Sequence, residues 1–230
     1  AIHILVGTGN NGGDALAIAR LLHCQGYSVQ VWLQGKDQKC SPDNITQRKI
    51  NQKLGIKTQA IVLDDFAEEL TAASLIVDAL FGVGLCREIT GTWAKVITSA
   101  NAQIAPKISV DIPSGIHADT GQILGTAIQA DLTVTCAFPK WGHYLDPGLD
   151  CIGRLETVDI GIPPLYYTEH PEELLTPEHV KSLKPRPRRQ NVHKGSLGRL
   201  GIVAGSMGMS GAAQLAASAA LETGVGLVFL

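Results

Sequence analysis

The chain is poor in aromatic residues and in net charge. Phe, Trp and Tyr together make up 5% of its 230 residues, and the formal net charge is −2. So small a net charge gives no general reason to expect nucleic acid or an anionic membrane as a partner. The sequence also lacks an apolar run that approaches the ~20 residues needed to span a bilayer. We therefore expect neither nucleic acid nor a membrane as a partner.

Paired cysteines of the metal-binding or redox type are missing as well. The five cysteines are Cys24, Cys40, Cys86, Cys136 and Cys151. Their number is odd and no Cys-x-x-Cys pair occurs, which argues against zinc or a redox dithiol and favours reduced thiols in a cytoplasmic protein. Cys86 lies in a glycine-rich turn and is a candidate nucleophile, but an inert thiol is favoured because no His neighbours it in the sequence.

A basic leader is absent from the N-terminus. Residue 1 opens directly into a core-like stretch, which argues against a signal peptide. The lack of an initiator Met indicates that sequence is missing upstream. With 45% apolar and 17% charged residues, the composition is that of a folded chain with a substantial core. The length allows one large domain, or one domain and part of another.

What the chain does have is three apolar stretches that each end in a small polar or glycine-rich turn. Residues 2–6 lead into Gly7-Thr8-Gly9, residues 75–79 into Gly82-Val83-Gly84, and residues 108–111 into Pro113-Ser114-Gly115. If all three stretches are parallel strands, their turns lie together at the carboxyl edge of one sheet. In open α/β sheets this edge is where ligands bind, so we expect the functional site there.

Strand and helix patterns alternate along the first 160 residues. Alternating or continuous apolar patterns predict strands at residues 2–6, 28–33, 60–63, 75–79, 107–112, 132–137 and 155–160. Helical spacing predicts helices at residues 15–25, 42–54, 64–73 and 90–100. This alternation is typical of a mostly parallel sheet covered by helices on both faces, a Rossmann-like three-layer α/β sandwich.

The character of the chain changes after Gly161. Residues 162–190 are rich in proline and carry the basic run 184–189, which predicts a connector with one short helix between Pro177 and Leu183. The basic run is a candidate phosphate contact, although a solvated linker is favoured. A new unit then follows, with a strand at residues 200–204, a helix at 212–223 and a strand from 226. It is too short to bury a core alone, so we expect it to pack on the first domain or to open a further one.

The first turn matches the dinucleotide fingerprint Gly7-x-Gly9-x-x-Gly12, with a predicted strand before it and a predicted helix after it. The second strand, however, ends in Leu33-Gln34-Gly35 and lacks the acidic residue that holds a ribose. An ordinary nicotinamide dehydrogenase is therefore disfavoured. A tight turn with a capped helix is the plainer alternative, but eight small or polar residues in succession exceed what a cap needs.

Two aspartates end apolar strands, and an amide and a hydroxyl lie in the neighbouring turns. A carboxylate at the end of a buried strand is costly unless it is hydrogen-bonded, ion-paired or bound to a cation, although either Asp78 or Asp111 could merely cap its turn. Asn11, Asp78 and Ser114 together offer hard oxygen ligands that suit a group 1 or group 2 cation better than zinc or copper.

Three more polar residues follow the strand predicted at residues 132–137. Lys140, after Phe138-Pro139, either faces a ligand phosphate or lies in solvent, and the sequence leaves both open. His143 and Tyr144 are adjacent candidates for the site, with a surface loop as the favoured alternative.

At these motifs the sequence resembles the NAD(P)HX epimerases (the YjeF N-terminal family), which form the N-terminal domain of bifunctional NAD(P)H-hydrate repair enzymes. The matching segments are residues 9–14, 77–85, 110–115, 138–140 and 159–163. The resemblance covers residues 1–163 and implies an isomerase of nucleotide repair, in which the R and S forms of hydrated NADH and NADPH interconvert. It also implies a homo-oligomer.

The resemblance further implies a set of site residues. The substrate contacts would be Asn10, Asn11, Gly12, Gly13, Asp14, Gly82, Val83, Gly84, Leu85, Cys86, Arg87, Glu88, Asp111 and Lys140. Asn11, Asp78 and Ser114 would bind K⁺. Asp111 would face the reactive ring, and we predict it to be the acid–base group because inversion at carbon requires proton transfer.

The last part of the chain resembles a second family. Residues 193–195, 198–199 and 205–212 are similar to the start of the ADP-dependent NAD(P)H-hydrate dehydratase domain, a lyase with a ribokinase-like fold. Residues 164–192 would then be a linker, residues 193–230 the domain's opening, and Ala212 a hydrate contact. The family's later Asn-x-Gly-x-Gly-Asp motif has no counterpart here, so the chain as given is not expected to dehydrate. Helices that the epimerase family carries before its first strand are also absent.

Two other function classes remain open. Some relatives of such domains are non-catalytic binding scaffolds, and a plain NAD(P)-dependent oxidoreductase is a weaker option. The presence of Asn11, Asp78, Asp111 and Ser114 favours chemistry, since a scaffold has no need of them.

Overall fold

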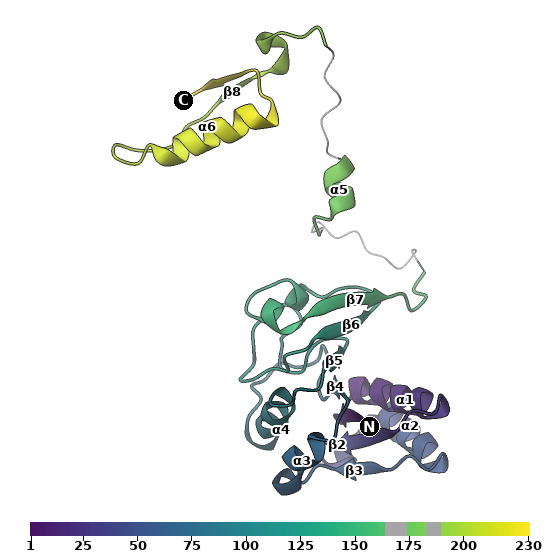
Figure 1. Cartoon of the computed structure of the whole chain (residues 1–230). Coiled ribbons are helices and arrows are strands. Elements are labelled where there is room, and N and C mark those ends of the chain that lie inside the picture. The colour runs from purple at the N-terminus through teal and green to yellow at the C-terminus, as the bar shows by residue number, and fades with distance from the viewer. Residues whose placement is uncertain (164–173, 183–189) are drawn as a thin grey trace. The chain divides into compact units, whose positions relative to one another are not determined.

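The computed structural model describes residues 1–163, 174–182 and 190–230. The chain divides into two compact units, Ala1–Tyr167 and Thr168–Leu230. The first unit is built around a seven-stranded sheet in the order β3-β2-β1-β4-β5-β6-β7, visible in the lower part of Figure 1. Every neighbouring pair of these strands is parallel, so the α/β prediction is confirmed and the sheet is wholly rather than mostly parallel.

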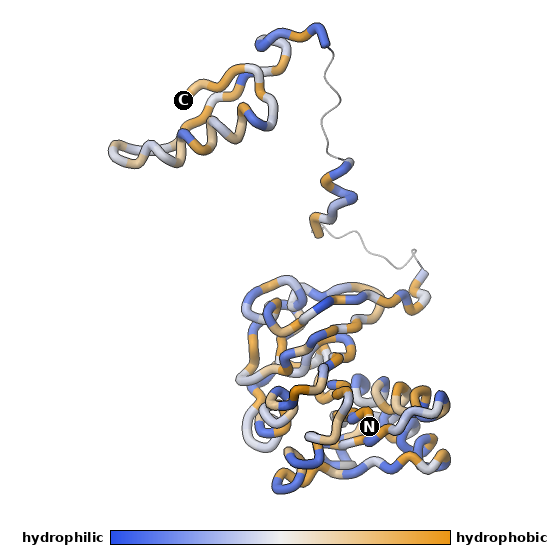
Figure 2. Tube along the Cα trace, in the orientation of Figure 1, coloured by the Kyte–Doolittle hydropathy of each residue, from blue (hydrophilic) through white to orange (hydrophobic). Residues whose placement is uncertain are grey.

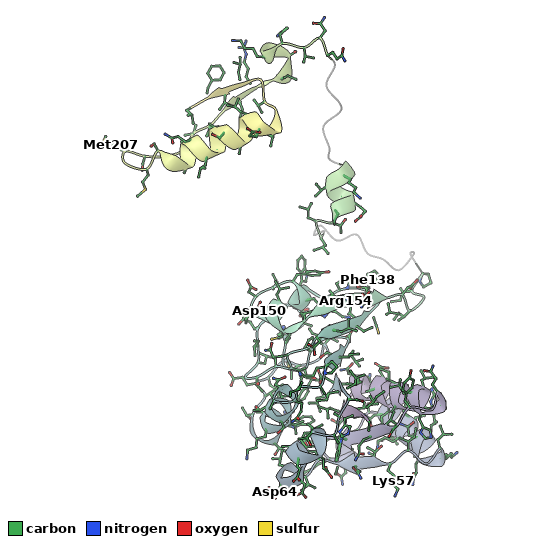
Figure 3. All side chains as sticks on the ribbon, viewed as in Figure 1. Lys57, Asp64, Phe138, Asp150, Arg154 and Met207 are labelled. Carbon is green, nitrogen blue, oxygen red and sulfur yellow. The ribbon has the colours of Figure 1, made fainter. Side chains whose placement is uncertain are left out.

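The strands of the first unit are β1 (Ile2–Val6), β2 (Val29–Leu33), β3 (Thr58–Ala60), β4 (Leu75–Ala79), β5 (Lys107–Val110), β6 (Leu132–Cys136) and β7 (Arg154–Val158). Its helices are α1 (Asn10–Cys24), α2 (Pro42–Lys53), α3 (Leu63–Leu70) and α4 (Gly91–Asn101), with short 3₁₀ turns η1 (Asp37–Lys39), η2 (Trp141–His143) and η3 (Gly148–Cys151). Lys57, beside β3, and Arg154, on β7, mark the two ends of the sheet in Figure 3.

Helices cover both faces of the sheet because alternate strand residues point to opposite sides. On β1, Leu5 joins a buried cluster with Phe66 of α3 and Ile97 of α4. Its neighbours Ile4 and Val6 join a second buried cluster that includes residues of α1. Figure 2 shows hydrophobic and hydrophilic residues interspersed along the trace of the first unit. The sheet thus forms the middle layer of the first unit.

Several element boundaries differ from those expected, among them the start of α1 and the position of β3. Helix α1 begins at Asn10 rather than at residue 15, because Gly9 takes an extended N-cap conformation and the two glycines that follow are tolerated in a buried helical turn. Strand β3 covers Thr58–Ala60 rather than residues 60–63, since its register with β2 ends at Ala60 and α3 starts three residues later.

The carboxyl ends of β1, β4 and β5 meet at one edge, as predicted. Val6 pairs with Ala79, and Asp78 pairs with Ser109 of β5. The three turns that follow these strands are therefore neighbours in space, although they lie about 30 to 100 residues apart in the chain.

The second unit contains α5 (Pro177–Ser182), η5 (Lys194–Leu197), β8 (Arg199–Gly201), α6 (Gly211–Thr223) and β9 (Leu227–Phe229). Strands β8 and β9 pair in parallel, with α6 between them in the chain. The predicted short helix after Pro177 is present as α5, whereas the basic run 184–189 lies outside the described residues. Across the ranges that the structure describes, none of the helices is both long enough and apolar enough to cross a membrane.

Candidate active site at the carboxyl edge of the sheet

A cavity of about 580 Å³ lies over the first two turns. It is lined by Thr8, Gly9, Asn10, Asn11, Asp14, Leu80, Phe81, Gly82, Val83, Gly84, Leu85, Cys86, Arg87 and Asp111. These include most of the predicted substrate contacts. Glu88 instead lines a smaller neighbouring cavity. A separate cavity of about 640 Å³ between α2 and β3 contains none of the predicted site residues.

Glycines allow the turns below the cavity to approach closely. A Cβ atom on Gly7 would lie 1.8 Å from the Leu80 carbonyl oxygen, and one on Gly12 would lie 2.1 Å from the Gly7 carbonyl oxygen. Gly12 and Gly13 are buried and do not line the cavity. Because these two residues have no side chain, α1 can pack closely against its neighbours. A direct contact of either glycine with the substrate stays a prediction.

Asp78 lies beneath the turns with no exposed surface. Its carboxylate accepts hydrogen bonds from Ser109 Oγ (2.8 Å), Ser114 N (2.8 Å) and Ser114 Oγ (2.6 Å), and a longer one from Leu80 N (3.3 Å). Burial raises the pKa of Asp78, and the hydrogen bonds from Ser114, Ser109 and Leu80 oppose that rise. The residue therefore joins β4, β5 and the turn after β5 in one network.

The three residues predicted to share a cation belong to one hydrogen-bonded chain. Asn11 Nδ2 donates to the Phe81 carbonyl oxygen at 2.9 Å, and Phe81 N donates to Ser114 Oγ at 2.9 Å. Ser114 Oγ in turn contacts Asp78. The structure thus brings Asn11, Asp78 and Ser114 together through Phe81, a residue that the sequence analysis missed.

Oxygen atoms of several kinds lie close together around Asp78 and Ser114. Within the described ranges, no group of three or more His, Cys, Asp or Glu side chains could hold a metal ion. The Asp78 carboxylate, the Ser114 hydroxyl and the Phe81 carbonyl form a donor set of hard oxygens, with the Asn11 amide beside them. Such a set suits a group 1 or group 2 cation better than zinc or copper.

Asp111 lies directly after β5 in an uncommon backbone conformation. Its φ is +68°, in the left-handed region that Asp and Asn adopt more readily than most residues. Its Oδ1 atom accepts hydrogen bonds from Thr135 Oγ1 (3.0 Å) and Cys136 N (3.2 Å), and it is ion-paired with Lys140 Nζ. Among the described residues all of these bonds end on Oδ1, which leaves Oδ2 for a ligand in the cavity.

Lys140 therefore faces a carboxylate and not open solvent. Its Nζ contacts Asp111 Oδ1, donates to Thr135 Oγ1 at 2.6 Å, and its side chain is 21% exposed. Burial raises the pKa of the nearby Cys136 thiol, and the Asp111 charge raises it further. This arrangement argues against Cys136 as a nucleophile. Lys140 does not line the cavity, so a substrate contact of its own stays a prediction.

A second cavity carboxylate lies near Asp111. Burial raises the pKa of Asp14, and the negative charges of Asp111 and Asp43 add to the effect. Asp14 lies on α1, just after the first helical turn, and lines the cavity with Asp111. The ligand space is thus bordered by two carboxyl groups from different turns.

His143 is buried, with 1% of its surface exposed, and is not the surface residue that the sequence favoured. Its Nδ1 accepts a hydrogen bond from Lys140 N at 3.0 Å. Its Nε2 lies 3.0 Å from the Asp111 carbonyl oxygen. Because a carbonyl can only accept, Nε2 must carry the proton, and the ring is the neutral Nε2–H tautomer.

The protonation of His143 predicts a pH effect on stability. Burial lowers the pKa of His143 below its ordinary value of 6.5. Below that value the unfolded chain takes up a proton that the folded chain does not bind, so the free energy of unfolding falls as the pH drops. We expect a larger loss between about pH 7.5 and about pH 5.5 for the parent than for His143→Gln, measured by urea unfolding. Equal losses in the two proteins would contradict the assignment.

Phe81 and Thr135 are the contributors that sequence reasoning missed, whereas His143 was named as a candidate but expected on a surface loop. Thr135 had a usable signal, since it lies on β6 beside the end of β5, whereas the main-chain role of Phe81 leaves no trace in residue type. Ala212 lies at the start of α6 in the second unit and is exposed.

Fold and site together define the class: a doubly wound α/β domain whose polar cavity lies at the carboxyl edge of a parallel sheet. Residues 1–142 match the family model described as YjeF-related protein N-terminus, and the chain belongs to that family. The family resemblance stated from the motifs is thereby confirmed.

Relatives of two lengths match the chain. It is 43% identical to a bifunctional NAD(P)H-hydrate repair enzyme of Moorella thermoacetica over 99% of this chain and 44% of that protein. It is 40% identical to an NAD(P)H-hydrate epimerase of Levilactobacillus brevis over 73% of this chain and 75% of that protein. The chain thus spans less than half of the bifunctional relative.

A solved structure shares the fold. The crystal structure of yeast YNL200c matches with a TM-score of 0.58 and 22% identity, over 69% of this chain and 65% of the yeast chain. At this identity the match supports the α/β architecture alone.

Proposed function

We propose that the first unit is an NAD(P)H-hydrate epimerase, which interconverts the R and S forms of NADH or NADPH hydrated at C6 of the nicotinamide ring. The observation that carries the proposal is Asp111, whose Oδ1 is held by Lys140, Thr135 and Cys136 at the wall of the cavity. A binding scaffold needs no such arrangement.

The cavity offers distinct regions for the two ends of a dinucleotide. The N-terminus of α1, with Asn10 and Asn11, faces the cavity, and a helix N-terminus presents unpaired N–H groups that favour anions. Arg87 and the glycines of the turn after β4 lie along another wall and suit phosphates. The nicotinamide end then faces Asp111.

Inversion at C6 requires that the bond to the hydroxyl oxygen breaks and forms again on the other face. The hydroxyl leaves as water after it gains a proton, with the electron pair of the ring nitrogen filling the bond to C6. Water then adds to the opposite face and loses a proton. Asp111 Oδ2 would exchange these protons, and a positioned acid–base group contributes about 10²–10⁴-fold in rate.

The oxygen atoms near the turns after β1, β4 and β5 are chemically suited to bind K⁺. Asn11, Asp78 and Ser114 would hold it through amide, carboxylate and hydroxyl oxygens. When bound, it would supply a fixed positive charge that orders the turns after β1, β4 and β5. The residues themselves position the cavity wall.

A cation at this place predicts a response to K⁺. We expect Asn11→Ala to raise the KCl concentration for half-maximal epimerisation ~10-fold or to abolish the response, in line with losses seen when metal-site partners are removed. KCl would be titrated at constant ionic strength with choline chloride. The neighbouring Asn10→Ala, which alters the cavity but not the donor set, is the matched control and should keep the parental response. Identical KCl curves for Asn11→Ala and the parent would refute the site.

The test of the activity itself is direct. Each hydrate epimer, separated by chromatography, would be incubated with the 230-residue chain, and formation of the other epimer would be followed against the slow uncatalysed rate. We expect both directions to reach the same epimer ratio. Absence of acceleration in the presence of K⁺ would refute the proposal.

The remainder of the chain suits a second repair step. We propose that residues 164–192 link the epimerase domain, residues 1–163, to the opening of an ADP-dependent dehydratase domain with a ribokinase-like fold, residues 193–230. The length of the Moorella relative and the motifs at residues 193–212 support this organisation. Ala212 as a hydrate contact and a homo-oligomeric assembly are part of the same proposal.

A further inference from the structure

We propose that His143 is a positioning residue for epimerisation: its imidazole ring fixes the distance between the main chain of Asp111 and the main chain of Lys140, and so holds the carboxylate and ammonium groups together. The inference rests on the proposed epimerase function. None of the predicted roles drawn from the sequence included this residue.

The first step is the hold on Asp111. A residue other than glycine with φ near +68° persists only where its surroundings stabilise it. Here the Asp111 N–H donates to the Val134 carbonyl at 2.7 Å, and the Asp111 carbonyl accepts from His143 Nε2. Both sides of the residue are therefore anchored, one by β6 and the other by the ring.

The second step is the hold on Lys140. Its N–H donates to His143 Nδ1, and its carbonyl accepts from the His143 N–H at 3.0 Å. The ring and the backbone N–H of His143 thus both bind the main chain of Lys140, at the start of η2. Gly142 lets this turn pack closely on the loop at residues 117–118, since a Cβ atom there would lie 2.5 Å from the His117 carbonyl oxygen.

The third step is the choice of side chain. Only a neutral imidazole is a rigid ring with an acceptor on one edge and a donor on the other. Protonation would put a second N–H on Nδ1, opposite the Lys140 N–H. Two charged groups act on the His143 ring, the Lys140 ammonium and the Asp111 carboxylate. These two groups form an ion pair with each other.

Substitutions can separate the two ends of the ring. His143→Gln places an amide nitrogen near the Nε2 position and keeps the donor to Asp111. His143→Asn places an amide oxygen near the Nδ1 position and keeps the acceptor for Lys140. His143→Leu removes both. We expect kcat to fall ~10–100-fold for Leu and less for Gln and Asn, with KM within about threefold of the parent, because outer groups that orient a reactive group typically have effects of this size.

A variant away from the site serves as the control for a loss of stability. Ile97→Ala, on α4 in the core, should lower the melting temperature at least as much as His143→Leu and leave kcat within about twofold. The inference is overturned if all three His143 variants keep the parental kcat, or if Gln and Asn lose as much kcat as Leu.

A readout that needs no substrate separates this inference from the proposed function. Nitrogen-15 NMR of the parent should show the His143 ring protonated at Nε2 and not at Nδ1, and the Lys140 amide signal should move in His143→Gln but stay in His143→Asn. An Nδ1–H ring overturns the inference even if the chain epimerises. A chain that shows the expected tautomer but does not epimerise refutes the proposed function instead.

Discussion

Asp111→Asn should lower the rate of epimerisation by about 10²–10⁴-fold, the contribution expected of a positioned acid–base group. Asn is nearly the same size as Asp and accepts the left-handed backbone that Asp111 adopts. The variant therefore keeps the shape of the turn and loses the carboxylate that pairs with Lys140 and that we propose to exchange protons. Chromatographic separation of the R and S hydrates gives the rate.

The loss must be specific to this carboxylate. Asp119→Asn changes an exposed acid in the loop that follows the same turn and should leave the rate within about twofold. A rate for Asp111→Asn as close to the parent as that of the control would remove Asp111 from the mechanism. A structural cause would instead show as a matching fall in the melting temperature of Asp111→Asn.

Asp78→Ala should lower the free energy of unfolding by about 3–5 kcal/mol. The carboxylate is fully buried and accepts from the backbone N–H groups of Leu80 and Ser114 and from two hydroxyls. The hydroxyls can rotate toward other acceptors, but the N–H groups cannot, and each unsatisfied buried donor costs ~1–3 kcal/mol. Urea unfolding followed by circular dichroism measures the change.

A matched aspartate on the surface controls for the substitution itself. Asp159 accepts a single hydrogen bond, from Gly161 N, in an exposed turn, and Asp159→Ala should change the free energy of unfolding by less than about 0.5 kcal/mol. If Asp78→Ala also cost less than about 1 kcal/mol, the buried network would not organise the turns in the way described.

Periodicity and strand-end chemistry were enough to predict the parallel sheet and the edge where the turns meet. The side chains of Asn11, Asp78 and Ser114 could be named because their residue types are unusual at the ends of apolar strands. The boundary of α1 could not, since Gly12 and Gly13 disfavour a helix locally and are accepted only because Gly7 and the backbone around Asn44 pack against them.

His143 shows a different limit of sequence reasoning. A histidine in a loop rich in glycine and proline is usually exposed, and its burial depends on where the Asp111 carbonyl points. The direction of that carbonyl depends on the positive φ of Asp111, a conformation that aspartate allows but that cannot be read from the sequence. Interactions between main chain and side chain across 32 residues therefore stay hidden until the backbone is known.

The anchoring of Asp78 by β5 and by the turn after it has a consequence for how the cavity forms. The cavity is lined by segments that become neighbours only when β1, β4 and β5 have docked side by side. A chain in which these three strands have not docked therefore lacks the complete lining of the cavity. Occupancy of the cavity is therefore linked to the docking of these three strands, and a ligand that binds only the folded domain would stabilise that domain against unfolding by mass action.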